Sequence, residues 1–296
     1  MILIDYSAIC HAAFYASGSK IDEDMLRHMI LNSIRMYNLK YRSEYGQLVI
    51  AVDSSSWRRD VFANYKKGRS TAKEESKVDW QAYYEIVNQL SRDIRDNFPY
   101  PVIHIKGAEA DDIIATLTAR IIVADVPFGT TPERVMIISA DHDFIQLHCE
   151  RVRQFSPGTK KAVSHKNPKE YLTEHIIRGC SGDGVPNILS DDDAICNPDK
   201  RQVPVRKKFI EDVKELLNRK DTAGLEKLID REKLFRNVTC IDFRSIPKNI
   251  SEAINAEFER QRLNYSLKPS KILTFLIEKR CRNLIECIED FNNQAT

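Results

Sequence analysis

The run MILID, residues 1–5, sets four apolar residues in front of one aspartate. Three later stretches of strand length are similarly apolar: QLVIAVD (47–53), VIHI (102–105) and RVMIISAD (134–141). Runs rich in Val, Ile and Leu are typical of strands that a parallel sheet buries on both faces. A fifth strand is expected in VRQFSP (152–157). Together these runs predict a buried, mainly parallel sheet.

Helical patterns lie between the predicted strands. Apolar residues recur at every third or fourth position in three segments, 26–37, 83–94 and 113–121, which indicates amphipathic helices. Because strands and helices alternate, we expect residues 1–160 to form an α/β domain whose central sheet is flanked by helices. Beyond about Thr159 the strand pattern fades, and helical patterns follow at 171–178, 206–217 and 270–291. Residues 161–296 are therefore expected to form a helical C-terminal domain.

Composition limits the classes of protein to which the chain can belong. With 296 residues, 42% of them hydrophobic, it can bury a sizeable core in one or two domains. Seven scattered cysteines form no CxxC pair, which suits a reducing compartment better than a disulfide scaffold or a zinc site. The first residues lack the basic region of a signal peptide, and no apolar run approaches the roughly 18 residues of a membrane span. We expect a soluble intracellular monomer that contacts no membrane.

Acidic residues follow the predicted strands. Asp5, Asp53 and Asp141 close three of them, with Asp143 two residues later, and the motif Glu109-Ala-Asp-Asp comes shortly after the third strand. The carboxyl ends of parallel strands meet at one edge of a sheet, so these groups should converge. Two like charges about 4 Å apart repel by on the order of 4 kcal/mol at an effective dielectric constant of about 20.

Helix capping is the alternative explanation for each of these acids. An aspartate after a strand often caps the next helix, but a cap needs one side chain and the motif at residues 109–112 supplies three. Carboxylates in this number suit two Mg²⁺ ions, for which Mn²⁺ can substitute, and such a pair catalyses phosphodiester hydrolysis.

Two segments are basic although the net charge of the whole chain is only +2. Residues 57–77 hold seven Lys or Arg against three acids, and residues 199–209 hold five against one. A solvated charged loop is one explanation, and phosphate binding is the other. The first segment follows Asp53 directly, which favours contact with nucleic acid by Arg58, Arg59, Lys66, Lys67 and Arg69.

Several motifs together resemble those of the 5′ nuclease, or flap endonuclease, superfamily, and within it the ribonucleases H of T-even-type bacteriophages. They are LIDYS, IAVD…WRRD…YKKGR, GAEADD and ISADHDF. The resemblance implies a PIN-like nuclease core and a C-terminal domain containing a helix–three-turn–helix element. It also implies two metal ions, the first held by Asp5, Asp53, Glu109 and Asp111. The second would be approached by Asp111, Asp141, Asp143 and Asp183, with Asp112 close by.

The resemblance also implies roles for the basic residues. The segment at about 57–85 would begin an arch beside the cleavage site, where Lys66 and Arg69 contact the reacting phosphate. The helix–three-turn–helix element would hold duplex backbone through main-chain amides and a bound monovalent cation. Arg206, Lys207 and Lys208 are its candidate phosphate contacts.

The activity implied is that of a 5′→3′ exonuclease that removes RNA primers from RNA–DNA hybrids and cuts 5′ flaps of branched duplex DNA. Such an enzyme would act in phage DNA replication in the cytoplasm of the infected bacterial host. A phage single-stranded DNA-binding protein or a sliding clamp is an expected partner. Two alternatives are a PIN-type ribonuclease, which shares the acidic edge, and a catalytically silent branched-DNA-binding module.

One position departs from the family pattern. The family motif is Gly-Asp-x-x-Asp, whereas RGCSGDGVPN places Cys180 where the first aspartate belongs and retains Asp183 as the second. A thiol is a poor ligand for Mg²⁺. Either the second metal site is weakened, or water and Asp183 suffice, or the acids at 191–193 substitute. A small buried side chain is the other interpretation of Cys180.

Overall fold

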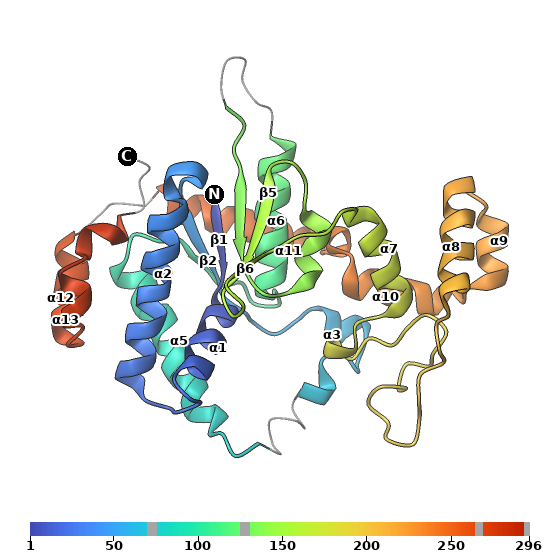
Figure 1. Cartoon of the computed structure of the whole chain (residues 1–296), viewed down its shortest axis with the longest axis horizontal. Helices are drawn as coiled ribbons and strands as arrows, with labels where there is room; N and C mark the ends of the chain where they lie inside the picture. Colours follow the sequence, from blue (N-terminus) through green and yellow to red (C-terminus); the bar gives the residue numbers. More distant parts are fainter. Residues whose placement is uncertain (70–75, 125–130, 264–268, 293–296) are drawn as a thin grey trace. The chain divides into compact units, whose positions relative to one another are not determined.

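The computed structural model describes residues 1–69, 76–124, 131–263 and 269–292. The chain divides into two compact units, each assembled from separate stretches of sequence (Figure 1). The sheet unit comprises residues 1–55, 78–164 and 248–296. The helical unit comprises residues 56–77 and 165–247. Among the described residues, none of the helices combines the length and the apolar character that a membrane crossing requires.

A six-stranded sheet in the order β3-β2-β1-β4-β5-β6 forms the centre of the sheet unit. Its strands are β1 (Ile2–Asp5), β2 (Leu48–Ala51), β3 (Val102–Ile103), β4 (Val135–Ile138), β5 (Val152–Ser156) and β6 (Lys161–Val163). β1 to β5 pair in parallel, and β6 pairs antiparallel with β5. Every residue of β1, β2, β3 and β4 is buried, as expected for a parallel sheet covered on both faces. The predicted mainly parallel α/β fold is confirmed.

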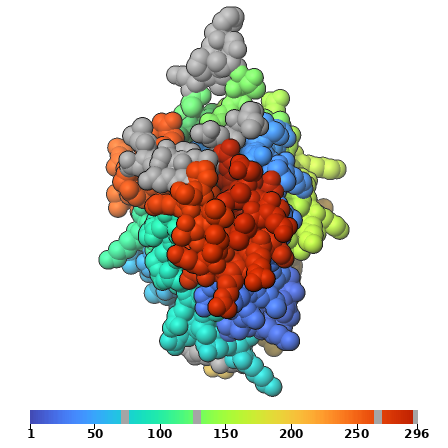
Figure 2. Space-filling view, turned by 90° about the vertical axis from the view of Figure 1, so that its left-hand side faces the viewer, coloured from blue at the N-terminus to red at the C-terminus, as the bar shows by residue number. Residues whose placement is uncertain are grey.

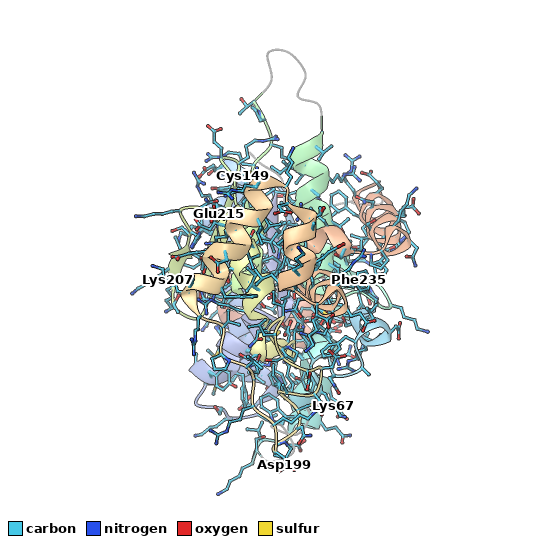
Figure 3. The ribbon with its side chains drawn as sticks, turned by 90° about the vertical axis from the view of Figure 1, so that its right-hand side faces the viewer. Lys67, Cys149, Asp199, Lys207, Glu215 and Phe235 are labelled. Atoms are coloured by element: carbon cyan, nitrogen blue, oxygen red, sulfur yellow. The ribbon has the colours of Figure 1, made fainter. Side chains whose placement is uncertain are left out.

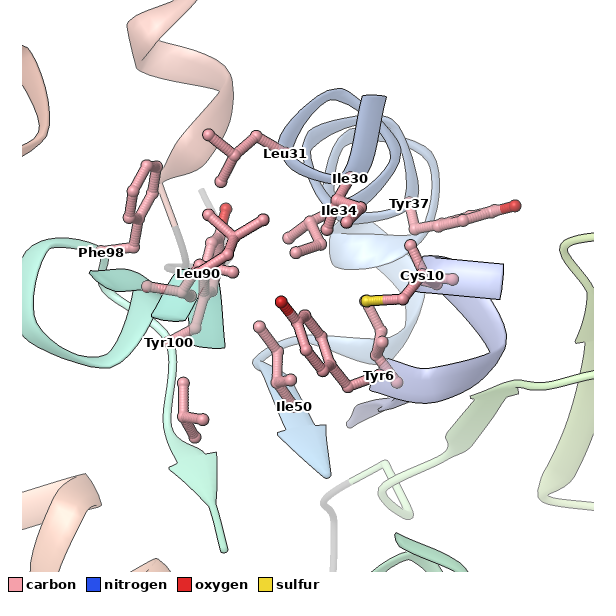
Figure 4. Packing of buried hydrophobic residues seen from close by; sticks show 14 of the residues in the cluster. Tyr6, Cys10, Ile30, Leu31, Ile34, Tyr37, Ile50, Leu90, Phe98 and Tyr100 are labelled. Carbon is pink, nitrogen blue, oxygen red and sulfur yellow. The ribbon is translucent and has the colours of Figure 1, made fainter. Parts of the chain in front are cut away.

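Helices cover the two faces of this sheet. On one face, α1 (Tyr6–Ala16), α2 (Glu23–Tyr45) and α5 (Trp80–Asn97) pack with the side chains of Ile2, Ile4 and Ile50. Figure 4 shows this core, with Ile30, Ile34 and Leu90 converging from α2 and α5. Successive strand residues point to opposite faces, and α6 (Ala110–Val123) contacts β1, β2 and β4 outside this cluster, with α11 (Lys248–Leu263) beside it.

The last part of the chain completes the core of the sheet unit. Here α12 (Pro269–Glu278), α13 (Arg282–Ile285) and the short 3₁₀ helix η4 (Ile288–Phe291) place five buried side chains in the main apolar cluster: Ile272, Phe275, Leu276, Leu284 and Phe291. Figure 2 shows α12 and α13, in red, seated among α2 and α5. The Asn38 side-chain amide on α2 donates to the carbonyl oxygens of Asp290 and Asn292. The described residues of 248–292 therefore belong to the sheet unit, whereas the sequence pattern grouped them with the helical domain.

The single helix expected over 270–291 is interrupted. Arg280 adopts a left-handed backbone conformation, with φ of 54°, and Cys281 then caps α13. A residue in this conformation ends an α-helix. The break turns the chain so that Leu284 and Phe291 point back into the core.

The helical unit contains α3 (Arg58–Val61), α7 (Pro168–Arg178), α8 (Lys207–Arg219), α9 (Thr222–Leu228) and α10 (Arg231–Ile241). The short 3₁₀ helices η2 (Ser181–Asp183) and η3 (Phe243–Ser245) follow α7 and α10. Two small apolar clusters hold these elements together. One joins Phe62 and Tyr65 to α10, and the other joins α7 to α8 through Ile177 and Ile210. Part of the expected arch segment, residues 70–75, lies outside the described residues.

Replacing Phe291 by alanine should destabilise the protein by about 3–5 kcal/mol, since a fully buried aromatic ring leaves a cavity. Phe235, which is 66% exposed, offers a matched control, and Phe235→Ala should cost less than about 1 kcal/mol. Urea unfolding followed by circular dichroism measures both. Equal midpoints for the two variants would contradict the packing of η4 into the core.

Candidate active site

Asp5 ends β1 and lies almost fully buried, with 6% of its surface exposed. Its Oδ1 accepts hydrogen bonds from the Ser7 hydroxyl at 3.0 Å and the Ala8 backbone N–H at 3.1 Å, so the side chain caps α1. Its Oδ2 accepts a hydrogen bond from the Ser139 hydroxyl at 2.8 Å. Burial first, and then the negative charge of Asp53, raise the pKa of Asp5. The carboxylates that end β1 and follow β2 are therefore within electrostatic reach of each other.

A second group of acids follows β4. The hydroxyl oxygen of the buried Ser139 accepts a hydrogen bond from the Asp141 backbone N–H at 3.1 Å. Asp141 in turn caps the 3₁₀ helix η1 (His142–Leu147), because its Oδ1 accepts the Asp143 backbone N–H at 2.9 Å. The buried Gln154 amide on β5 donates to the carbonyl oxygens of Ser139 and Asp141 at 2.9 and 2.6 Å. Ser139 thus links the acids of β1 and β4, and Gln154 fixes the turn after β4.

Asp53 and the start of α6 form the third group. The Ala110 backbone N–H donates to Asp53 Oδ1 at 2.9 Å. Glu109 caps α6, and Asp112 accepts the Glu109 backbone N–H at 2.9 Å, which makes a reciprocal capping box. Glu109 and Asp112 are buried, whereas Asp111 is half-buried. Asp53 is therefore tied to the helix terminus that carries Glu109 and Asp111, and Asp112 serves the helix cap.

Seven carboxylates thus stand on residues that end or follow β1, β2 and β4 or begin α6. We call this set the acidic edge: Asp5, Asp53, Glu109, Asp111, Asp112, Asp141 and Asp143. Neither Asp5 nor Asp53 forms an ion pair with a cationic side chain among the described residues. A cation placed between two such carboxylates would favour their ionised forms and offset the repulsion that raises the pKa of Asp5. The donors are all oxygens, which fits a hard divalent cation.

In the helical unit, Asp183 lies against the side chains that were expected to contact the reacting phosphate. Arg69 Nη2 donates to Asp183 Oδ1 at 2.5 Å, the Tyr65 hydroxyl donates to Oδ2 at 3.1 Å, and Lys66 Nζ lies 3.7 Å from Oδ1. Arg69 Nε also donates to the Gly182 carbonyl oxygen at 3.0 Å. The structure therefore brings Lys66, Arg69 and Asp183 together in one network.

The backbone fixes this network as well. Lys66 adopts a left-handed conformation with φ of 54°, and its backbone N–H donates to the Asp183 carbonyl oxygen at 2.7 Å. Gly184 also has positive φ, and a Cβ atom there would lie 2.9 Å from the Asn64 carbonyl oxygen. Only glycine fits such a close approach between two chain segments.

Cys180 packs beside the apolar cluster of Phe62 and Tyr65, and its backbone pairs with Val185 in a short bridge. This supports its interpretation as a small packing residue. The acids at 191–193, which were the alternative metal ligands, are engaged elsewhere. Asp191 pairs with Lys233, Asp192 pairs with Arg236, and Asp193 pairs with Lys200.

The candidate nucleic-acid contacts differ in exposure. Arg58 is 1% exposed, its Nε donates to the Cys240 carbonyl oxygen at 2.9 Å, and its guanidinium stacks over the Trp57 ring. The expectation that Arg58 contacts phosphate is therefore corrected, because the side chain is buried within the helical unit. Arg59 and Lys67 are exposed. Arg206, Lys207 and Lys208 are exposed at the start of α8, where Figure 3 shows Lys207.

A buried arginine that the sequence did not single out holds the loop before α8. Arg236 on α10 donates to the carbonyl oxygens of Pro186 at 2.9 Å and Asn187 at 3.1 Å. Asn187 in turn donates through its amide to the Val203 carbonyl oxygen at 2.9 Å. A buried charge is stable only with this kind of compensation. Arg236 therefore stabilises the segment from Pro186 to Val203, which precedes the basic start of α8.

Other contributors were also missed. Ser139 lies in the motif ISADHDF, two residues before Asp141. Its position at the end of the same strand could have indicated that it contacts the acids there. Gln154 carries no local signal, because the carbonyl groups to which it donates follow another strand.

Sequence comparisons match nucleases along almost the whole chain. A sequence model described as 5′-3′ exonuclease, N-terminal resolvase-like domain, matches residues 1–176, and one described as T4 RNase H, C terminal, matches residues 168–291. The Ribonuclease H of Enterobacteria phage T4 is 32% identical over 305 residues, which cover 98% of this chain and 95% of that protein. A 5′-3′ exonuclease of Buchnera aphidicola subsp. Acyrthosiphon pisum is 27% identical over 208 residues, which cover 64% of this chain and 65% of that protein.

Two solved structures share the fold. The T5 5′-exonuclease with divalent metal ions (zinc) bound has a TM-score of 0.59 at 16% identity and covers 88% of this chain and 99% of its own. The bacteriophage T5 D15 flap endonuclease, in a pseudo-enzyme-product complex with DNA and metal ions, has a TM-score of 0.57 at 16% identity, with 88% and 98% covered. The first sequence model spans more than half of the chain, and the T4 relative is similar over almost its full length. The chain therefore belongs to the 5′→3′ exonuclease family of nucleases.

Proposed function

We propose that this nuclease uses two Mg²⁺ ions, which Mn²⁺ can replace, to hydrolyse phosphodiesters from the 5′ side of RNA–DNA hybrids and flap duplexes. The observation that carries the proposal is the acidic edge, where four chain segments place carboxylates around a buried Asp5. When bound, the ions would supply a hydroxide from water and neutralise charge on the phosphate. Asp5, Asp53, Glu109 and Asp111 would hold the first ion, and Asp111, Asp141 and Asp143 the second.

The substrate class rests on the relatives. The T4 relative is named a ribonuclease H, and the T5 neighbour is described as a flap endonuclease in complex with DNA. We propose the same classes of nucleic acid here, with removal of RNA primers during phage replication as the biological role. Association with a single-stranded DNA-binding protein or a sliding clamp stays a prediction.

Lys66 and Arg69 are proposed to donate to oxygens of the reacting phosphate. The Asp183 carboxylate contacts the charged groups of both Lys66 and Arg69. We therefore propose that Asp183 positions these two side chains and does not ligate the second metal ion. Arg59, Lys67, Arg206, Lys207 and Lys208 are proposed to contact other phosphates. Such contacts make binding insensitive to sequence and strongly dependent on salt.

A monovalent cation was also expected in the C-terminal element. The carbonyl oxygens of Pro186 and Asn187 accept hydrogen bonds from Arg236. We therefore assign no monovalent cation to these two carbonyls.

Replacing Asp5 or Asp141 by asparagine should abolish Mg²⁺-dependent cleavage of a 5′-labelled flap duplex while leaving its binding largely unchanged. The loss should be on the order of a thousandfold in kcat, as for removal of a principal electrostatic stabiliser. Asparagine still caps a helix, so the fold should persist. Asp199→Asn, at an exposed loop position, should cleave like the parent. Turnover retained by either site variant would refute the metal assignment, and cleavage of free RNA in preference to the flap would favour the PIN-type alternative.

Asp183→Asn should lower the free energy of unfolding by about 1–3 kcal/mol in buffer containing EDTA, because it removes the charged partner of Arg69 and Lys66. The control is Asp191→Asn, whose carboxylate is 68% exposed and whose loss should cost less than about 1 kcal/mol. Thermal unfolding reports both values. A site that served only to bind metal would leave Asp183→Asn as stable as the parent without divalent ions.

Cys180→Asp restores the carboxylate of the family motif. If the second ion is weakly held in the parent, this variant should reach half-maximal cleavage at several-fold lower Mg²⁺ concentration, since each carboxylate strengthens binding of a hard cation. Cys180→Ser controls for loss of the thiol. Titration of activity with Mg²⁺ and Mn²⁺ decides the question, and superimposable curves for parent and Cys180→Asp would dismiss it.

A further inference from the structure

A cavity of about 450 Å³ opens at the carboxyl edge of β2 and β3 within the sheet unit. Its wall includes Asp53 after β2, His104 after β3, and Glu257 and Arg260 of α11. From α5 it includes Asn88, Ser91, Arg92 and Arg95. In open α/β sheets this edge is where ligands bind, and the volume lies within the range of about 300–1,000 Å³ that is usual for ligand sites. Because Asp53 belongs to both, the cavity is continuous with the acidic edge.

Three arginines give the wall of the cavity its chemical character: Arg92, Arg95 and Arg260. Arg92 donates to the neutral Gln89 amide oxygen at 2.7 Å, and it forms no ion pair with a carboxylate among the described residues. Arg95 pairs with Asp96 on its own helix, and Arg260 pairs with Glu257. All three arginines are exposed, and ion pairs in such positions contribute little and exchange readily. A planar guanidinium binds a phosphate through two parallel hydrogen bonds.

We propose that this cavity binds a phosphate of the substrate strand next to the one that is hydrolysed, and that Arg92, Arg95 and Arg260 are its ligands. This inference rests on the proposed function, because it places the reacting phosphate at the acidic edge beside Asp53. A strand held there must continue past Asp53, and on that side the cavity provides room and positive charge. The phosphate recognised is either the terminal 5′ phosphate or an internal phosphodiester.

The test compares four versions of one flap duplex with the parent enzyme and the triple variant Arg92→Gln, Arg95→Gln, Arg260→Gln. The flap is kept short enough for its 5′ phosphate to reach the cavity while the scissile linkage lies at the acidic edge. One substrate carries a 5′ phosphate and one carries a 5′ hydroxyl. The other two each carry one neutral methylphosphonate, on the 5′ side of the scissile linkage in one substrate and on the 3′ side in the other. For the parent, kcat/KM should fall roughly tenfold on the substrate that lacks the recognised phosphate, as for loss of one charged hydrogen bond. The substrate that shows this fall identifies the source of the phosphate. The triple variant should already have lost about the same factor and should show no further fall.

Arg262→Gln is the matched control. Arg262 lies on α11 like Arg260, is exposed and pairs with Glu259, but it does not line the cavity. It should behave like the parent, and circular dichroism should show that the variants are folded. Arg92→Gln alone should show part of the effect if the triple variant proves unstable. A penalty that persists in the triple variant, no penalty in the parent, or an equal loss in Arg262→Gln would overturn the proposal. Asp141→Asn with full activity would instead overturn the proposed function itself.

Discussion

Repulsion between carboxylates at the acidic edge is the constraint on which the rest of the structure depends. Asp5 is buried beside the charge of Asp53, and its pKa is raised for both reasons. A buried carboxylate beside a like charge is tolerated only if other groups satisfy its oxygens by hydrogen bonds or offset its charge. Here the Ser139 hydroxyl and the Ala8 backbone N–H satisfy the oxygens of Asp5. Compensation by neutral donors keeps the acids in place and leaves their negative charge available for divalent cations.

The order of the strands explains why these acids can meet. β1 lies at the centre, with β2 on one side and β4 on the other. The chain leaves β1 and β4 in opposite directions along the sheet. In open α/β sheets, ligands bind outside the carboxyl ends of the strands at such a reversal of strand order. α6 begins at this edge, and the partial positive charge of its N-terminus stabilises negative charge on Glu109 and Asp111. Topology therefore sets the site, and hydrogen bonds such as the one from Ala110 to Asp53 set its details.

Much of the sheet and the acidic edge could be predicted because both have local signals. A buried parallel strand is a continuous apolar run, and an acid after it needs no knowledge of distant residues. Arg58 was misassigned for the opposite reason, since its burial depends on Cys240, which lies far along the chain. The network of Asp183, Tyr65 and Arg69 is equally non-local. The place of α11, α12 and α13 in the sheet unit could not be predicted from the sequence. An amphipathic pattern shows that a helix has an apolar face but not which surface covers that face.

The contribution of α12, α13 and η4 to the main core bears on how the protein is made in the cell. Domains generally fold during translation as each one emerges from the ribosome. Here β1 is synthesised well before α12 and η4, yet the cluster it belongs to also contains Phe275 and Phe291. The nascent chain must therefore keep apolar surface of this cluster uncovered until residues 269–291 have been translated.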